Sequence, residues 1–227
     1  AMTPEKIALG QDRMVQSVDD TVQLLKNTLA RTGQSRNTLV IFTSDNGYLW
    51  GDHGLYNKFY PYLDSVHVPM MMIYPKHLTP GTDRRIVSNI DVAPTIYDAT
   101  GIDPMFHEVD GYSMLGPHRR DWFMIESGTK SFTPYWSAMI TSRFHYIETG
   151  YDPTISGDTR GSEAPPTSVE ELSFQEYYSL RDFQGQEMDN LIYSSPSRIP
   201  SLSSIQNDLR QKSWQGQGRT SALKGCY

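Results

Sequence analysis

The feature that most constrains this chain is an apolar run, residues 39–42, that ends three residues before Asp45 and Asn46. Such a run is typical of a strand that is covered on both faces, as in a parallel sheet. Ligands of open α/β sheets bind beyond the carboxyl ends of the strands, which is where these two side chains would stand. A carboxylate and an amide carbonyl are hard oxygen donors for Mg²⁺ or Ca²⁺, and Gly47 would ease the turn beyond them.

Residues 45–47 are also typical of an ordinary hairpin turn, because Asn and Gly tolerate positive φ. Taken alone, the tripeptide favours that turn. The wider sequence favours a site, because four motifs follow one another: Ser44-Asp-Asn-Gly-Tyr48, Gly51-Asp-His-Gly-Leu55, Lys58 and Val66-His-Val-Pro-Met70. Their order and spacing resemble the C-terminal portion of the sulfatase family, of alkaline-phosphatase-like fold, and the resemblance continues from about residue 11 to the C-terminus.

The resemblance implies roles for individual residues. Asp45 and Asn46 match the family's metal ligands, with Ca²⁺ favoured over Mg²⁺, and Lys58 matches the lysine that contacts the substrate sulfate. His53 is a second catalytic candidate, although a histidine in a loop is more often a satisfied surface residue. The family's nucleophile, a formylglycine, and its early aspartate pair have no match before Asp45. The resemblance therefore implies an incomplete sulfuric ester hydrolase that lacks its N-terminal part and is inactive alone.

Three alternatives stay open at this point. Another alkaline-phosphatase-like hydrolase, such as a phosphoesterase or phosphonate hydrolase, would share the metal ligands and use a different nucleophile. A non-catalytic binding or partner subunit would fit the absent nucleophile equally well. The motifs could also be a chance turn in an unrelated α/β domain.

Composition limits the partners of the chain. It has 227 residues, 37% of them hydrophobic, and a formal net charge of −6, so we expect no nucleic-acid partner. No apolar run is long enough for a membrane span, and the lone cysteine, Cys226, excludes an internal disulfide. The expected partners are a sulfate ester and either the missing N-terminal half or a second copy. The sequence leaves the compartment open among periplasm, cytoplasm and the outside of the cell.

The first predicted domain, residues 1–116, is the end of an α/β domain with a mainly parallel sheet. Apolar residues at helical spacing predict a helix over residues 7–31, and its stripe contains Met14, Val18, Val22, Leu25 and Leu29. A buried strand is predicted over residues 66–74 and a short helix after Asp91, which we expect to cap that helix rather than bind a ligand. Arg84 and Arg85 are expected to be solvated.

The second predicted domain, residues 117–227, has short aromatic and β-branched runs at 122–127, 136–141, 144–148 and 177–180. These predict a small antiparallel sheet, followed by a terminal helix at about 200–214. Residues 150–168 form a polar insertion between strands. Ser194 begins an S-x-P-S-R pattern, which resembles the site where sulfatases form formylglycine. Its position after the last strand is wrong for that site, so we expect a linker and an unmodified serine.

Overall fold

A computed structural model describes residues 4–103, 109–127, 136–150, 172–181 and 186–212. The helices in this part are α1 (Pro4–Arg31), α2 (Leu63–Val66), α3 (Val92–Thr100), α4 (Leu191–Ser194) and α5 (Leu202–Lys212). The strands are β1 (Val40–Phe42), β2 (Leu49–Trp50), β3 (Tyr56–Asn57), β4 (Met71–Ile73), β5 (Trp122–Ser127), β6 (Trp136–Thr141), β7 (Phe144–Gly150) and β8 (Leu172–Ser179).

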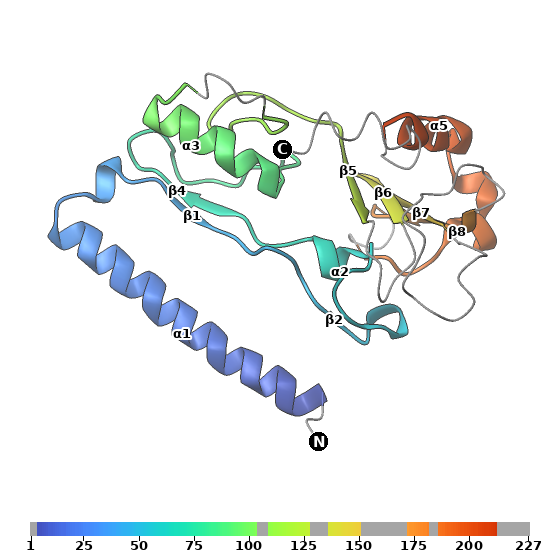
Figure 1. Ribbon diagram of the computed structural model, residues 1–227, viewed down its shortest axis with the longest axis horizontal. Helices are drawn as coiled ribbons and strands as arrows, with labels where there is room; N and C mark the ends of the chain where they lie inside the picture. The colour runs from blue at the N-terminus through green and yellow to red at the C-terminus, as the bar shows by residue number, and fades with distance from the viewer. Residues whose placement is uncertain (1–3, 104–108, 128–135, 151–171, 182–185, 213–227) are drawn as a thin grey trace.

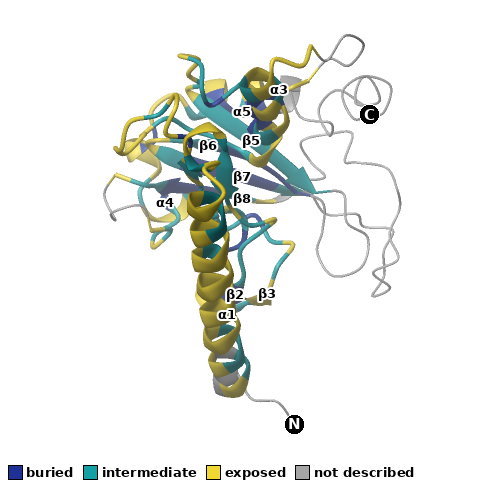
Figure 2. Ribbon diagram, turned by 90° about the vertical axis from the view of Figure 1, so that its left-hand side faces the viewer, coloured by how far each residue is buried: buried dark blue, intermediate teal, exposed yellow. Residues whose placement is uncertain are grey.

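The predicted N-terminal helix is confirmed as α1, which ends before Gly33 at a φ of +72°. Its apolar stripe is largely exposed, with Met14 70% and Val18 44% accessible. Figure 2 shows the helix exposed along most of its length. None of the helices that the structure describes combines the length and apolarity of a bilayer-crossing segment.

The strand before Asp45 is present as β1, but its predicted parallel pairing is not found. β1 pairs antiparallel with β4, with Val40 opposite Ile73, and every strand pair in the described residues is antiparallel. The side chains of β1 are half-buried rather than covered on both faces. An apolar run reports burial potential and carries no information on strand direction, which explains this error. The β1–β4 ribbon runs between α1 and α3 (Figure 1).

The strand predicted over residues 66–74 is shorter than expected. Residues 63–66 form the single turn α2, and only Met71–Ile73 pair as β4. The helical turn ends at Val66, where the strand was predicted to begin, and Pro69 follows three residues later. A proline cannot donate to a strand ladder, which accounts for the late start of pairing.

The antiparallel C-terminal sheet is confirmed, in the order β5-β6-β7-β8. One of its faces packs against the terminal helices, and the core there includes Tyr146, Leu191 and Leu209, all at most 1% exposed. Figure 1 places α5 beside this sheet. The predicted terminal helix is confirmed as α5, while most of the insertion at 150–168 lies outside the described residues. The proposed domain boundary at residue 116 stays a prediction.

A buried carboxylate joins the segment before α3 to the segment before β5. Asp91 is 2% exposed, accepts two hydrogen bonds from Arg120 at 2.7 and 2.8 Å, and also accepts from the Tyr112 N–H at 2.8 Å. It completes a capping box with Ser88 at the start of a 3₁₀ turn, η3 (Asn89–Asp91). The predicted role at α3 is wrong in detail, because the Asp91 side chain makes no capping hydrogen bond to that helix.

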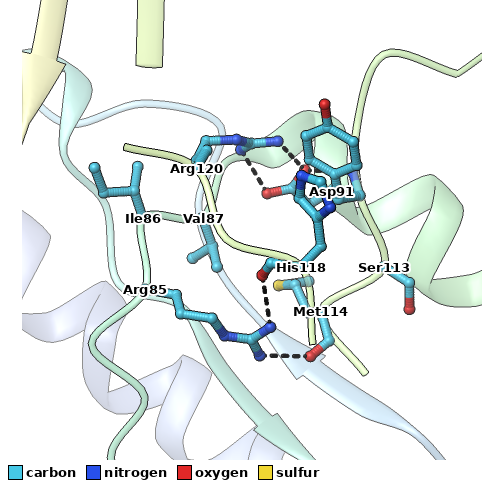
Figure 3. A pocket seen from close by; sticks show the side chains of 9 residues that line it. Arg85, Ile86, Val87, Asp91, Ser113, Met114, His118 and Arg120 are labelled. Carbon is cyan, nitrogen blue, oxygen red and sulfur yellow. Dashed lines mark hydrogen bonds and ion pairs between the residues drawn. The ribbon is translucent and has the colours of Figure 1, made fainter. Parts of the chain in front are cut away.

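Arg85 is held beside this carboxylate, and its predicted solvation is wrong. The guanidinium donates to the carbonyl oxygens of Met114, Gly116 and His118 and pairs with Asp83. Figure 3 shows the small pocket that Arg85, Asp91 and Arg120 line together. The charge pattern alone did not reveal the carbonyl groups, because they come from a segment about thirty residues away.

We predict that Asp91→Asn lowers the free energy of unfolding by about 3 kcal/mol, because it leaves the Arg120 guanidinium without its buried counter-charge. Urea denaturation monitored by circular dichroism measures this change. Asp83→Asn is the matched control, since Asp83 pairs with Arg85 while its side chain is 52% exposed. The control should cost less than about 1 kcal/mol. Equal losses in both variants would contradict the assignment.

Candidate functional site

The turn after β1 is held by its own side chains and by η3. Asp45 is exposed, and its Oδ1 accepts from the Asn46 N–H at 2.9 Å and from the Ser44 hydroxyl at 3.3 Å. The Asn89 side-chain amide donates to the carbonyl oxygens of Ser44 and Asp45, at 3.2 and 3.3 Å. The carboxylate therefore stands at the carboxyl end of β1 on a braced turn, as the sequence predicted.

Gly47 is required by a close backbone approach rather than by positive φ, which it does not adopt. A Cβ at this position would lie 2.1 Å from the carbonyl oxygen of Asp64. The Gly47 N–H donates to the carbonyl oxygen of Ser65 at 2.8 Å. This contact seats the turn that carries Asn46 directly on α2, and any larger residue would displace it.

Lys58 and Asn46 are brought together. The Lys58 ammonium donates to Oδ1 of Asn46 at 3.2 Å, and the Asn46 amide donates to the Gly47 carbonyl at 2.7 Å. Residues on either side of the lysine have positive φ, +91° at Asn57 and +82° at Phe59. Such values are rare outside glycine, so the surrounding structure must hold the loop in this shape.

His53 contacts a different set of residues from Asn46 and Lys58. It has a φ of +55°, and its ring stacks on Tyr62 with centroids 3.8 Å apart. Its Nε2 lies 3.7 Å from a carboxylate oxygen of Glu187. Among the described residues no contact joins His53 to Asn46 or Lys58, so the structure does not bring all four candidates into one cluster.

No sequence motif pointed to Glu187, which follows β8 in the chain. Its side chain is 2% exposed and accepts from the ring of His145 and from the Leu63 N–H at 2.8 Å, and the ring of His53 lies 3.7 Å away. Burial alone raises the pKa of this carboxyl, but its interactions with His145 and His53 outweigh burial and lower the pKa to about 2. Glu187 is therefore a stable anion in the interior.

A second buried carboxylate, Glu176, lies beside it on β8 and has different partners. The hydroxyl groups of Tyr62 and Tyr178 donate to it, at 3.1 Å for Tyr62. Burial raises the pKa of Glu176, and the two hydroxyl groups only partly oppose this effect. The two carboxylates thus differ in electrostatics, because one faces imidazole rings and the other faces phenols.

The metal ligands predicted from the sequence fit a hard cation in type and fall short in number. Asp45 and Asn46 offer a carboxylate and an amide oxygen, whereas Ca²⁺ takes six to eight oxygens. Within the described part of the chain, no group of three or more His, Cys, Asp or Glu side chains could hold a metal ion. Any divalent ion at this turn needs further ligands.

Ser194 is the last residue of α4, and its hydroxyl donates to Asp189 at 2.9 Å. Pro196–Arg198 form a 3₁₀ turn, so the predicted linker is more ordered than expected. The expectation of an unmodified serine stays a prediction.

Comparison with known proteins identifies the first part of the chain. The sequence pattern of the Sulfatase family matches residues 6–102. N-acetylglucosamine-6-O-sulfatase from Bacteroides thetaiotaomicron is 34% identical over 90 residues, which are 39% of this chain and 16% of that protein. Residues 6–102 are a sulfatase-family segment. The resemblance seen in the four motifs is therefore confirmed.

Solved structures extend the likeness of the sulfatase segment to most of the chain at the level of fold. A protein in complex with its substrate D-glucosamine-2-N,6-O-disulfate has a TM-score of 0.66 at 22% identity, over 87% of this chain and 37% of that one. The phosphonate monoester hydrolase of Agrobacterium radiobacter also has a TM-score of 0.66 at 22% identity, over 88% and 40%. The α/β fold class is thus supported, and this chain spans well under half of each relative.

We predict that Gly47→Ala costs about 2 kcal/mol or more in unfolding free energy, because the new methyl group overlaps a backbone oxygen that cannot rotate away. Urea denaturation gives the value. Gly81→Ala is the control, since nothing lies within 4 Å of a Cβ built at that position. It should change stability by less than about 0.5 kcal/mol. A neutral Gly47→Ala would show that α2 does not seat the turn.

A second prediction concerns acid. Because folding lowers the pKa of Glu187 from an ordinary value of 4.5 to about 2, its stabilisation is present above pH 4.5 and is lost as the pH falls toward 2. Glu187→Gln should remove that part of the acid dependence, on the order of 2 to 3 kcal/mol. Unfolding free energies measured from pH 6 to pH 2 test this.

Glu176→Gln is the matched control, because folding raises the pKa of Glu176 instead. The unfolding free energy of this variant should fall between pH 4.5 and pH 2 at least as steeply as that of the unsubstituted protein. The groups that face Glu187 are His53, His145, Tyr62, Asp64, Glu176 and Tyr178. If Glu187→Gln loses stability in acid as steeply as the unsubstituted protein, other groups cause that loss.

Proposed function

We propose that this chain supplies part of the active site of a sulfuric ester hydrolase. In this proposal Asp45 and Asn46 are metal ligands and Lys58 binds the sulfate group. The observation that carries the proposal is the contact of the Lys58 ammonium with Asn46 Oδ1 at the carboxyl end of β1. This contact supports the proposal because it joins a cation to one of the two proposed metal ligands, and an anionic ester held on a metal would need a cation close by.

Lys58 suits the role because its ammonium is a compact charge with three donors. One donor is engaged with Asn46, which leaves two directions for sulfate oxygens. A divalent ion, expected to be Ca²⁺, would neutralise sulfate charge when bound at Asp45 and Asn46. Asn46 can serve both groups, because an amide oxygen accepts at two lone pairs. The formylglycine nucleophile would come from residues outside this sequence.

His53 was a second catalytic candidate, and its contacts support an indirect role. Its ring is stacked on Tyr62 and its Nε2 faces Glu187, so both are directed at neighbours within the chain. We propose that His53 contributes by holding its loop in place rather than by touching the substrate.

The sulfatase proposal is preferred to the phosphonate hydrolase alternative on sequence identity. The Bacteroides relative is a sulfatase at 34% identity, whereas the phosphonate hydrolase shares 22%, which speaks to fold alone. The absent nucleophile fits a non-catalytic binding subunit equally well, and the chimera assay below distinguishes that alternative from the sulfatase proposal.

A partner surface forms part of the proposal. Met71 and Ile73 on β4 are 56% and 48% exposed, and the stripe of α1 is exposed as well. Within the described residues β1 pairs with β4 only, so its second edge is open to further strands of a mainly parallel sheet. We propose that the rest of a sulfatase domain, or failing that a second copy, covers this surface.

The isolated chain should not hydrolyse nitrophenyl sulfate with Ca²⁺ or Mg²⁺, because it offers two protein oxygens and no nucleophile. Calorimetry should give a Ca²⁺ dissociation constant weaker than about 1 mM. Turnover that both Asp45→Ala and Lys58→Ala abolish would overturn the proposed inactivity. Turnover that neither substitution affects would come from a contaminant.

The positive half of the test is a chimera. Residues 44–58 replace the corresponding segment of the Bacteroides thetaiotaomicron sulfatase, and turnover of its own substrate is measured. We expect activity that Lys58→Ala lowers by about 100-fold or more, since a charge that acts on the transferring group is lost. Tyr56→Phe, at a residue 52% exposed, is the control and should retain activity. An active chimera insensitive to Asp45→Ala and Lys58→Ala would refute the proposed roles.

A further inference from the structure

The C-terminal sheet contacts the candidate site through residues that the proposed function does not use. Two of these residues contact the segments at separate places, Glu187 after β8 and Trp136 at the start of β6. Both are buried, with Trp136 4% exposed and the Glu187 side chain 2% exposed. Each reaches a segment that carries a candidate residue, across 77 or more positions of sequence.

Glu187 contacts the start of α2, against which the turn with Asn46 packs. Its carboxylate accepts from the N–H of Leu63, the first residue of α2, at 2.8 Å. This N–H has no partner inside so short a helix, so a charged acceptor satisfies an otherwise orphan donor. Two residues later, the carbonyl oxygen of Ser65 accepts from the Gly47 N–H. Two hydrogen bonds, joined by the backbone of residues 63–65, therefore connect Glu187 to the residue next to Asn46.

Glu187 also holds the loop that leads to Lys58. Its carboxylate pairs with His53 of the Gly-Asp-His-Gly motif, whose ring stacks on Tyr62 directly before α2. His145 on β7 donates to the second carboxylate oxygen and fixes the side chain from the sheet. A single buried anion thus connects the loop, α2 and the sheet.

Trp136 acts on the loop independently. Its indole N–H donates to the carbonyl oxygen of Phe59 at 2.9 Å, one residue after Lys58. Phe59 has a φ of +82°, which a bulky residue adopts only when its surroundings impose it. The indole supplies such a constraint at the strained residue itself.

We infer that Glu187 is a positioning residue, which holds the turn with Asn46 and the loop with Lys58 in register from the C-terminal sheet, with Trp136 as a second support. That these two segments form a functional site rests on the proposed function. The positioning itself is a property of the described contacts and is measured without activity.

The experiment is hydrogen–deuterium exchange of the full chain at pH 7, followed by mass spectrometry. In Glu187→Gln, we expect exchange at least tenfold faster in peptides covering residues 44–66, with a clearly smaller change in peptides from β6 and β7. Glu176→Gln is the matched control, a buried carboxylate of the same region that accepts from the Tyr62 hydroxyl but contacts neither Leu63 nor His53 in the structure, and it should change residues 44–50 much less than Glu187→Gln does. Trp136→Phe should accelerate exchange near residues 57–60 only.

A purely structural role is distinguished by the side-chain amide resonance of Asn46, recorded by NMR. It should shift in Glu187→Gln, because the Lys58 contact is disturbed, and stay in place in Glu176→Gln. Unchanged exchange in residues 44–66, or acceleration spread equally over the sheet, would overturn the inference.

Should Glu187→Gln not fold, His53→Gln provides the test, because it leaves Glu187 with His145 and Leu63. We expect faster exchange in residues 51–58 and an unchanged sheet, and unaltered exchange in that loop would overturn the inference. The proposed function fails separately, in the chimera assay, which depends on Asp45 and Lys58 themselves.

Discussion

The buried carboxylate of Glu187 joins three separate parts of the described structure. Two histidines and a backbone N–H converge on it, from β7, the Gly-Asp-His-Gly loop and α2. Removing a charge of this kind from water is costly, and only complete pairing makes it favourable. Because its partners come from both halves of the chain, the carboxylate fixes where the sheet lies relative to the turn after β1.

The candidate site is assembled from short segments rather than from one rigid element. The turn after β1 supplies Asp45 and Asn46, a loop with two non-glycine residues at positive φ supplies Lys58, and Asn89 braces the turn from a third segment. The elements that flank these segments are too short to be stable alone, since β1 has three residues and α2 has four. Their geometry depends on contacts with α2 and the C-terminal sheet, which is why a site of this kind requires the second half of the chain.

The two halves of the described structure differ in how they bury apolar surface. The C-terminal sheet covers its own face with α4 and α5 and contains most of the fully buried large side chains. The helix α1 leaves its apolar stripe accessible (Figure 2), and Met71 and Ile73 of β4 are exposed as well. An amphipathic helix gains its stability from packing its apolar face, so the stripe on α1 is suited to a contact that the described residues do not supply.

The sequence by itself determined the features that depend on local pattern. Helical spacing predicted α1, and short aromatic and β-branched runs predicted the four strands of the C-terminal sheet. The order of the motifs identified the sulfatase segment with Asp45 and Asn46 after β1. Tertiary structure decided the rest. Four features depend on groups distant in sequence: strand direction, the contacts of Arg85, the reason for Gly47 and the place of Glu187. The Leu63 N–H, for example, donates to a carboxylate 124 residues away. Periodicity encodes which face a residue presents and not which distant group meets it, so these contacts could be found only in the folded chain.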